Sequence, residues 1–213
     1  MKKQYAKHII DIIETNSKVL DLGCGNGELL DVLRKEKKAT VYGVEIDFDY
    51  ALSCIKRGIS VFQGDIDEGL AEFSSKSYDY VILSQTLQQV KKPQFVISEM
   101  LRIGKKAIIT FPNFAYWQVR FQLFFKGVSP VTKAIPYEWH NTPNIRVITI
   151  KNFKELCEKE NISITYETPL FKNLLLRKLI PQKLSNLLLK QGVFIITNQA
   201  NQGCCKTPDT KKN

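Results

Sequence analysis

Three glycines spaced two residues apart follow an acidic residue in the run Asp21-Leu22-Gly23-Cys24-Gly25-Asn26-Gly27. Glycine lets a ligand approach the backbone, and the N-terminus of a following helix favours a negatively charged group. A second apolar segment ends at Glu45, about 20 residues beyond the turn, where a carboxylate suits ribose hydroxyls. These residue types at this spacing predict a nucleoside-binding site.

The spacing of the glycines narrows the choice of nucleoside. A dinucleotide-binding turn carries its third glycine at the sixth position, where this chain has Glu28, and no G-K-[ST] follows as in a phosphate-binding P-loop. A carboxylate suits the turn as well as a phosphate, because both are anions at a helix terminus. S-adenosylmethionine (SAM) offers a carboxylate, a ribose and an adenine. The alternative is a turn whose glycines only tighten the chain between a strand and a helix.

Four segments in order resemble the motifs of class I SAM-dependent methyltransferases. The glycine turn resembles their first motif, Glu45 their ribose-binding acid, Gln63-Gly64-Asp65-Ile66 their adenine-side motif, and Tyr80-Val81-Ile82-Leu83-Ser84-Gln85 their fourth strand. The resemblance implies SAM as cofactor and S-adenosylhomocysteine as product. It also implies cofactor contacts from Asp21, Gly23, Cys24, Gly25, Asn26, Gly27, Glu45, Ile46, Asp65, Ile66, Ser84 and Gln85.

The elements that must position these residues follow from alternating apolar and amphipathic segments. Strands are predicted at 18–22, 40–45, 59–63, 78–84, 105–110, 162–167 and 192–197. Helices are predicted at 1–16, 27–37, 47–57, 94–101 and 152–160. Such alternation predicts an α/β fold with a doubly wound, mostly parallel seven-stranded sheet, helices on both faces and an antiparallel last strand. We expect one domain over residues 1–197.

Two segments lie outside this plan. Residues 112–147 are rich in aromatic residues and proline, follow the fifth strand and are expected to form a lid over the site. Residues 169–190 are basic and leucine-rich, which suits helices that pack on their own core or dock on a partner or membrane surface. Residues 198–213 are polar and are expected to form a disordered tail.

The aromatic segment also holds the candidates for catalysis. A hydroxyl or carboxylic acid acceptor needs a base, and His140 is the first candidate because histidine commonly acts as a general base near neutral pH. Tyr137 and Glu138 are alternatives in the same loop, and Asn113 and Gln85 end strands where they can orient an acceptor. The competing interpretation is a locally hydrogen-bonded histidine beside a tyrosine that packs.

Composition limits the remaining functions. The net charge is +10, but no Asn/Asp-Pro-Pro-aromatic turn follows the fourth strand, which disfavours methylation of nucleic-acid bases. Five cysteines without a disulfide framework and two histidines without ligand spacing predict reduced thiols and no metal. No apolar run of 18 residues and no apolar signal core are present, so we expect a cytoplasmic protein without a transmembrane segment.

Several stretches resemble one family, the methionine biosynthesis protein MetW family. They are Gly43-Val44-Glu45-Ile46-Asp47, Leu83-Ser84-Gln85-Thr86-Leu87-Gln88, Phe111-Pro112-Asn113-Phe114, and the block from Pro130 to Trp139 continuing to Ile145. The resemblance implies a bacterial protein of methionine biosynthesis whose partner is homoserine O-acyltransferase (MetX). A small-molecule methyltransferase with an unidentified acceptor is the alternative, and a nucleic-acid methyltransferase is a third.

Overall fold

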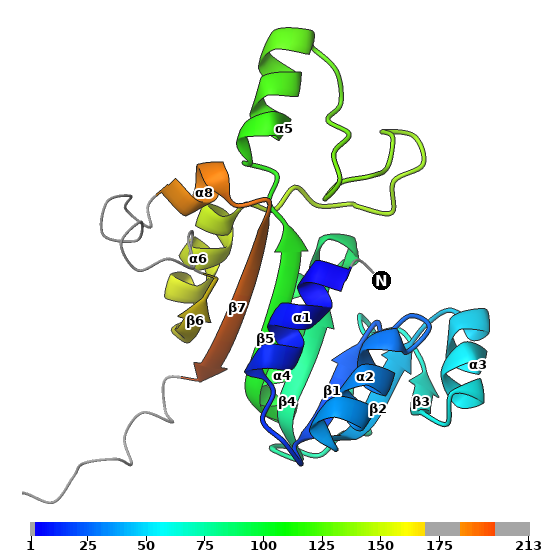
Figure 1. Cartoon of the computed structure of the whole chain (residues 1–213). Helices are drawn as coiled ribbons and strands as arrows, with labels where there is room; N and C mark the ends of the chain where they lie inside the picture. Colours follow the sequence, from blue (N-terminus) through cyan, green and yellow to red (C-terminus); the bar gives the residue numbers. More distant parts are fainter. Residues whose placement is uncertain (1–2, 169–183, 199–213) are drawn as a thin grey trace, which may run out of the picture.

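The computed structural model describes residues 3–168 and 184–198 of the 213-residue chain. Seven strands form one sheet in the order β3-β2-β1-β4-β5-β7-β6 (Figure 1). They are β1 (Lys18–Leu22), β2 (Thr40–Glu45), β3 (Ser60–Gln63), β4 (Tyr78–Ser84), β5 (Gly104–Pro112), β6 (Ile162–Glu167) and β7 (Gln191–Asn198). Strands β1 to β5 pair in parallel, and β7 runs antiparallel to both β5 and β6. The predicted fold class is therefore confirmed.

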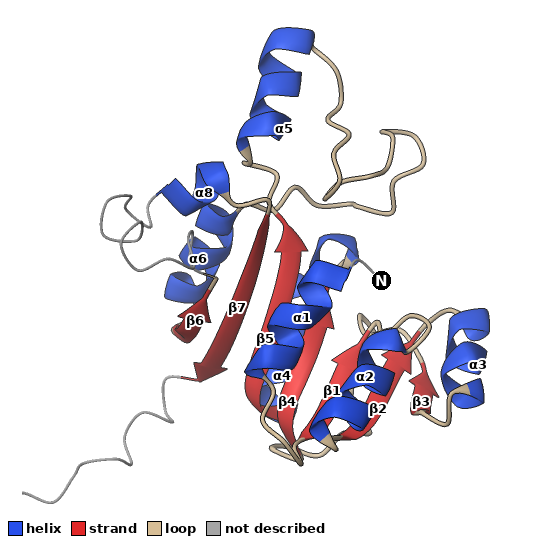
Figure 2. Cartoon of the chain, viewed as in Figure 1, coloured by secondary structure: helices blue, strands red, loops and turns tan. Residues whose placement is uncertain are grey.

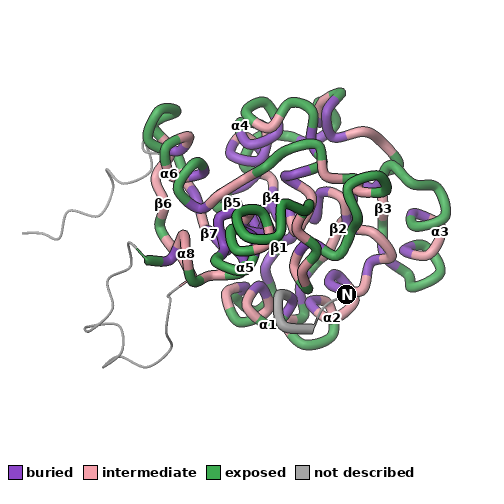
Figure 3. Tube along the Cα trace, turned by 90° about the horizontal axis from the view of Figure 1, so that it is seen from above, coloured by how far each residue is buried: buried purple, intermediate pink, exposed green. Residues whose placement is uncertain are grey.

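Helices cover both faces of the sheet (Figure 2). They are α1 (Lys3–Ile12), α2 (Glu28–Lys37), α3 (Phe48–Lys56), α4 (Pro93–Ile103) and α6 (Ile150–Lys159). Alternate strand residues enter opposite cores, because successive side chains of a strand point to opposite faces. Val19 and Ile82 pack with α1, α2 and α3, whereas Leu20 and Val81 pack with α4 and α6. Seen from above, the buried residues follow the central strands between the two helical layers (Figure 3).

Most predicted boundaries lie within one or two residues of the observed ones. The N-terminal helix is the exception, since it ends at Ile12 rather than at residue 16. Asn16 adopts a φ of 61°, a left-handed conformation that cannot continue a right-handed helix. The prediction for residues 13–16 is therefore wrong.

The aromatic segment 112–147 projects beyond the carboxyl ends of the strands (Figure 1). It begins with α5 (Trp117–Phe121), which continues into one π-helical turn, η2 (Gln122–Lys126), and then runs as an extended loop. Of the leucine-rich segment, residues 169–183 lie outside the described part of the chain, and a short helix, α8 (Ser185–Leu188), precedes β7. The predicted tail also lies outside the description, except that Asn198 still belongs to β7.

None of the described helices combines the length and apolar character needed to cross a bilayer.

Candidate functional site

A cleft lies where the strand order reverses, between the carboxyl ends of β1 and β4. This switch point is where open α/β sheets bind ligands. Two adjoining cavities, of about 320 Å³ and about 420 Å³, share Gly23, Gly25, Ser84, Gln85 and Gln89 in their walls. They therefore form one cleft with two halves, which we call the β1 half and the β2 half.

The glycines of the turn after β1 serve different purposes. Gly25 has a φ of 56°, and a Cβ added there would meet nothing within 4 Å. Gly27 has a φ of 76°, but a Cβ there would lie 2.9 Å from Cys54 Sγ, and Gly27 does not line either cavity. Gly25 thus leaves room for a ligand, whereas Gly27 lets α2 and α3 approach closely.

Glu45 ends β2 in the wall of the β2 half and is only 7% exposed. Its Oε2 accepts a hydrogen bond from the Gly25 N–H at 2.7 Å, and its Oε1 accepts from the N–H groups of Ile46 and Asp47 at 2.9 and 3.0 Å. Backbone donors thus fix this carboxylate against the glycine turn. The predicted residues Ile46, Asp65 and Ile66 line the same half.

Asp21, the penultimate residue of β1, lies in the wall of the β1 half and is 2% exposed. Its Oδ1 has no hydrogen-bond partner among the described residues. Burial raises the pKa of Asp21 to about 8, and the neighbouring Glu45 carboxylate adds to the rise. A buried carboxylate without a partner is costly, so this position favours a ligand that brings a donor or a positive charge.

Gln85 follows β4 and separates the two halves. Its backbone takes a φ of 60°, an unusual conformation for a residue with a side chain. Thr110 holds it there, because Thr110 Oγ1 accepts from the Gln85 backbone N–H at 3.1 Å and from Nε2 at 3.0 Å. Strained residues held in this way cluster at functional sites.

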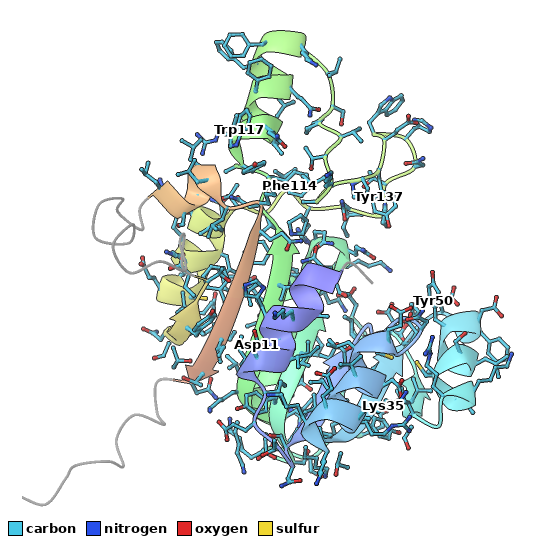
Figure 4. All side chains as sticks on the ribbon, viewed as in Figure 1. Asp11, Lys35, Tyr50, Phe114, Trp117 and Tyr137 are labelled. Atoms are coloured by element: carbon cyan, nitrogen blue, oxygen red, sulfur yellow. The ribbon has the colours of Figure 1, made fainter. Side chains whose placement is uncertain are left out.

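The inserted segment supplies the outer wall of the β1 half through Ala134, Pro136, Tyr137 and Asn144. Figure 4 shows Tyr137 on the loop beyond the carboxyl ends of the strands. The segment therefore forms part of the site wall, and its role as a lid stays a prediction.

The structure brings only one of the three catalytic candidates to the cleft. Tyr137 lines the β1 half, whereas Glu138 and His140 do not. The side chains of those two residues are 63% and 55% exposed, and Glu138 Oε2 lies 3.4 Å from His140 Nε2. Asn113 is also absent from the wall, because its Nδ2 donates to the carbonyl oxygens of Asn186 and Leu189 and so holds the chain before β7.

Cys24 lines the cleft, and its Sγ lies 3.7 Å from Cys54 Sγ. Burial raises the pKa of both thiols. A thiol rather than a thiolate is a poor nucleophile, so these side chains serve packing beneath the turn. Across the described ranges, no three His, Cys, Asp or Glu side chains gather as a metal site would require.

Several residues of the cleft are not among the predicted site residues, and Gln88, Gln89, Tyr50 and Asn144 are examples. Gln88 and Gln89 form the short helix η1 (Leu87–Gln89) directly after β4. Polar residues at the carboxyl end of a central strand are the signal that points to them. Asn144 gave no such signal, since it reaches the cleft only through the path of the inserted segment.

Comparisons with known proteins agree with this architecture. A family model described as methionine biosynthesis protein MetW matches residues 3–196. The bifunctional methionine biosynthesis protein MetXA/MetW of Rhodopirellula baltica is 41% identical over 168 residues, which cover 75% of this chain and 27% of that protein. The ubiquinone biosynthesis O-methyltransferase of Escherichia coli O127:H6 is 33% identical over 94 residues, which cover 41% of this chain and 38% of that protein. The chain thus spans well under half the length of these curated relatives.

Solved structures share the fold. A SAM-dependent methyltransferase from Archaeoglobus fulgidus matches with a TM-score of 0.64 and 18% identity, covering 91% of both chains. An S-adenosylmethionine-dependent methyltransferase from Mesorhizobium loti matches with a TM-score of 0.64 and 12% identity, covering 90% of this chain and 95% of that one. At such low identity these likenesses establish the fold alone.

Proposed function

Because the chain belongs to the methionine biosynthesis protein MetW family, we propose that it binds SAM and acts with a homoserine O-acyltransferase in methionine biosynthesis, in the cytoplasm. The match over residues 3–196 bears out the family resemblance that the sequence motifs predicted. The observation that carries SAM binding is the cleft with two halves that meet at Gly25. Its walls contain eleven of the twelve predicted cofactor residues, all except Gly27.

The residues present fit SAM. The partnerless Oδ1 of Asp21 suits the ammonium group of its methionine moiety, and the space beside Gly25 admits the chain near the backbone. Glu45, at the end of β2, suits the ribose hydroxyls, while Asp65 and Ile66 line the half proposed for adenine. SAM would supply an activated methyl group, so the protein's task would be to position an acceptor and exclude water.

The proposed partner rests on the relative from Rhodopirellula baltica, whose name joins MetXA and MetW in one bifunctional protein. A surface outside the core suits such a partner. Phe121, Phe124 and Phe125, which we call the aromatic ridge, lie on α5 and η2, and Phe124 is 82% exposed. Their rings contact one another, with centroids 4.8 Å apart from Phe121 to Phe125 and from Phe124 to Phe125. Exposed aromatic clusters of this kind are typical of protein interfaces.

The test is the homoserine acylation rate of the cognate O-acyltransferase with and without this chain. We expect a higher rate and co-elution of the two proteins, and SAM is then added to learn whether it regulates the complex. The double variant Phe124→Ser/Phe125→Ser is expected to lose both effects. The double variant Phe48→Ser/Ile55→Ser is the matched control, since it removes exposed apolar side chains from α3. An unchanged rate together with separate elution contradicts the partner role.

A small-molecule methyltransferase with an unidentified acceptor is the second candidate. It is favoured by the outer end of the β1 half, which lies beyond the residues proposed to bind SAM and carries Tyr137 in its wall. Among the catalytic candidates Tyr137, Glu138 and His140, we therefore place Tyr137 first. Methyl transfer is checked by following S-adenosylhomocysteine formation with hydroxyl, carboxyl and amine acceptors. Tight SAM binding without turnover on any class favours SAM as an effector.

A further inference from the structure

The β1 half of the cleft carries an unusual set of polar atoms. Over the described residues, three buried side-chain oxygen or nitrogen atoms lack a hydrogen-bond partner: Asp21 Oδ1, Gln88 Oε1 and Asn144 Oδ1. All three belong to residues in the wall of the 320 Å³ cavity, and all three are oxygens, which accept hydrogen bonds. Buried polar atoms normally have partners, so three in one cavity identify what the cavity binds.

The identity of the Gln88 atom is fixed by its other contact. Gln88 Nε2 donates to the Gln85 carbonyl oxygen at 2.6 Å, and turning the amide around would place two oxygens against each other. The Gln88 side chain therefore presents an oxygen to the cavity. At 4% exposure the residue is also removed from bulk water.

The backbone brings Gln88 and Asn144 together from distant parts of the chain. The Gln88 carbonyl oxygen accepts from the N–H groups of Ile145 and Arg146 at 3.0 and 3.1 Å. These bonds tie the short helix after β4 to the inserted segment directly beside Asn144. The two amide oxygens thus belong to a built wall in which each element fixes the other.

The charges of the wall point the same way. The described lining includes the acids Asp21 and Glu28 but no Lys, Arg or His, although the chain has 31 Lys and Arg residues. At the end lined by Gln88 and Asn144, away from the backbone N–H groups of the glycine turn, such a wall offers an anion no positive charge and accepts groups with N–H or O–H donors.

We propose that the end of the β1 half lined by Gln88 and Asn144 is a subsite for a small molecule that presents an amine or hydroxyl donor, and that it rejects anionic ligands. The inference rests on the proposed function, since SAM is expected to occupy Asp21 and to leave the two amide oxygens for the second molecule. The proposal concerns binding and not methyl transfer, so the second molecule can be a methyl acceptor or an effector.

The test uses three probes of equal length, n-butylamine, n-butanol and butyrate, added to the full chain saturated with S-adenosylhomocysteine. Binding is followed by saturation-transfer NMR, and SAM binding is measured separately by calorimetry. We expect signals from the amine and the alcohol and none from butyrate. Gln88→Leu and Asn144→Leu should each weaken the amine and alcohol by about tenfold, the effect of losing one good hydrogen bond. Gln94→Leu is the matched control, because Gln94 lies on α4 and donates to Glu160 outside the cavity.

A second readout separates this role from a structural one. Asn144→Leu replaces a partnerless buried oxygen with an apolar group, so its melting temperature should rise by about 2–4 °C while probe binding falls. A structural role predicts the opposite change in melting temperature.

Three results would overturn the subsite: butyrate binding as well as the amine, unchanged probe binding in both variants, or no probe binding to a chain that binds SAM normally. In the last case, water molecules rather than a ligand donate hydrogen bonds to the two amide oxygens. If the chain binds the amine and the alcohol but not butyrate, and does not bind SAM, the proposed function is refuted and the donor-selective subsite is still supported.

Discussion

Glu45 and Asp21 are buried acidic residues at the carboxyl ends of neighbouring parallel strands, yet their hydrogen bonding differs. Glu45 receives three backbone hydrogen bonds, from Gly25, Ile46 and Asp47. One oxygen of Asp21 has no partner among the residues that the structure describes, and burial raises the pKa of Asp21 to about 8. In the β2 half the protein itself supplies the hydrogen-bond partners of its buried carboxylate, whereas in the β1 half a ligand must supply the missing partner. Each prediction below tests this contrast.

Removing the fixed carboxylate should have the largest effect. Glu45→Ala deletes the proposed ribose acceptor and also frees the Gly25 N–H, so SAM affinity should fall by about 100-fold or more, as expected for a buried charged hydrogen bond. Calorimetry measures the loss. Glu36→Ala, on the exposed side of α2, is the control and should bind as the parent does. Equal SAM affinity in Glu45→Ala and the parent would remove Glu45 from the site.

The variant Asp21→Asn tests the role of the unpartnered carboxyl group in the β1 half. The folded-state pKa of Asp21 lies above its ordinary value of 3.8, so the folded protein binds the extra proton between 3.8 and about 8. Stability from this group is present at low pH and is lost as the pH rises towards 8, by at most about 1.4 kcal/mol per pH unit. Asp21→Asn should flatten this slope and weaken SAM by about tenfold, the value of one charge-assisted bond.

Urea denaturation from about pH 5 to about pH 8 measures the slope of the parent and the variant. A parent whose stability does not fall over this range would show that Asp21 keeps its charge in the folded state.

A pair of glycine variants separates ligand room from packing. Gly25→Ala should cost about 1 kcal/mol of stability for its positive φ and weaken SAM, because its Cβ enters the cleft. Gly27→Ala should cost about 2–3 kcal/mol, since its Cβ also meets Cys54 Sγ. Denaturation measures the stability of both variants, and calorimetry measures their SAM affinity. Equal stability losses would contradict the division of roles.

The smallest effects are expected in the inserted segment. His140→Ala should change SAM affinity by less than about twofold, because exposed loop side chains away from a site contribute within about 0.5 kcal/mol. Tyr137→Phe, in the wall of the β1 half, should alter binding of the second molecule more than that of SAM. A large loss of turnover in His140→Ala would mean that the loop moves to bring His140 over the cleft.

The sheet, most of its helix boundaries and the residues of the β2 half of the cleft could be predicted from the amino-acid sequence. Period-two alternation and the glycine turn are local signals. Glu45 is the last residue of β2 and Asp65 lies just after β3, and parallel pairing brings these strand ends to one edge. Individual residues show the limit of such signals: Gly27 fits the motif but packs against Cys54, and the first helix ends at Ile12, although periodicity would extend it to the left-handed Asn16.

The outer wall of the β1 half, by contrast, depends on the tertiary structure. The placement of Tyr137 in its wall, the outward position of His140 and the meeting of Gln88 with Asn144 all depend on the path of an irregular segment. That path has no repeating pattern, because its backbone hydrogen bonds are isolated turns, such as Asn141 N–H to the Glu138 carbonyl oxygen, and bonds to distant residues such as Gln88. Local propensity therefore identifies the residues that carry the fold, whereas the chemistry of the open half is set by contacts between segments far apart in the chain.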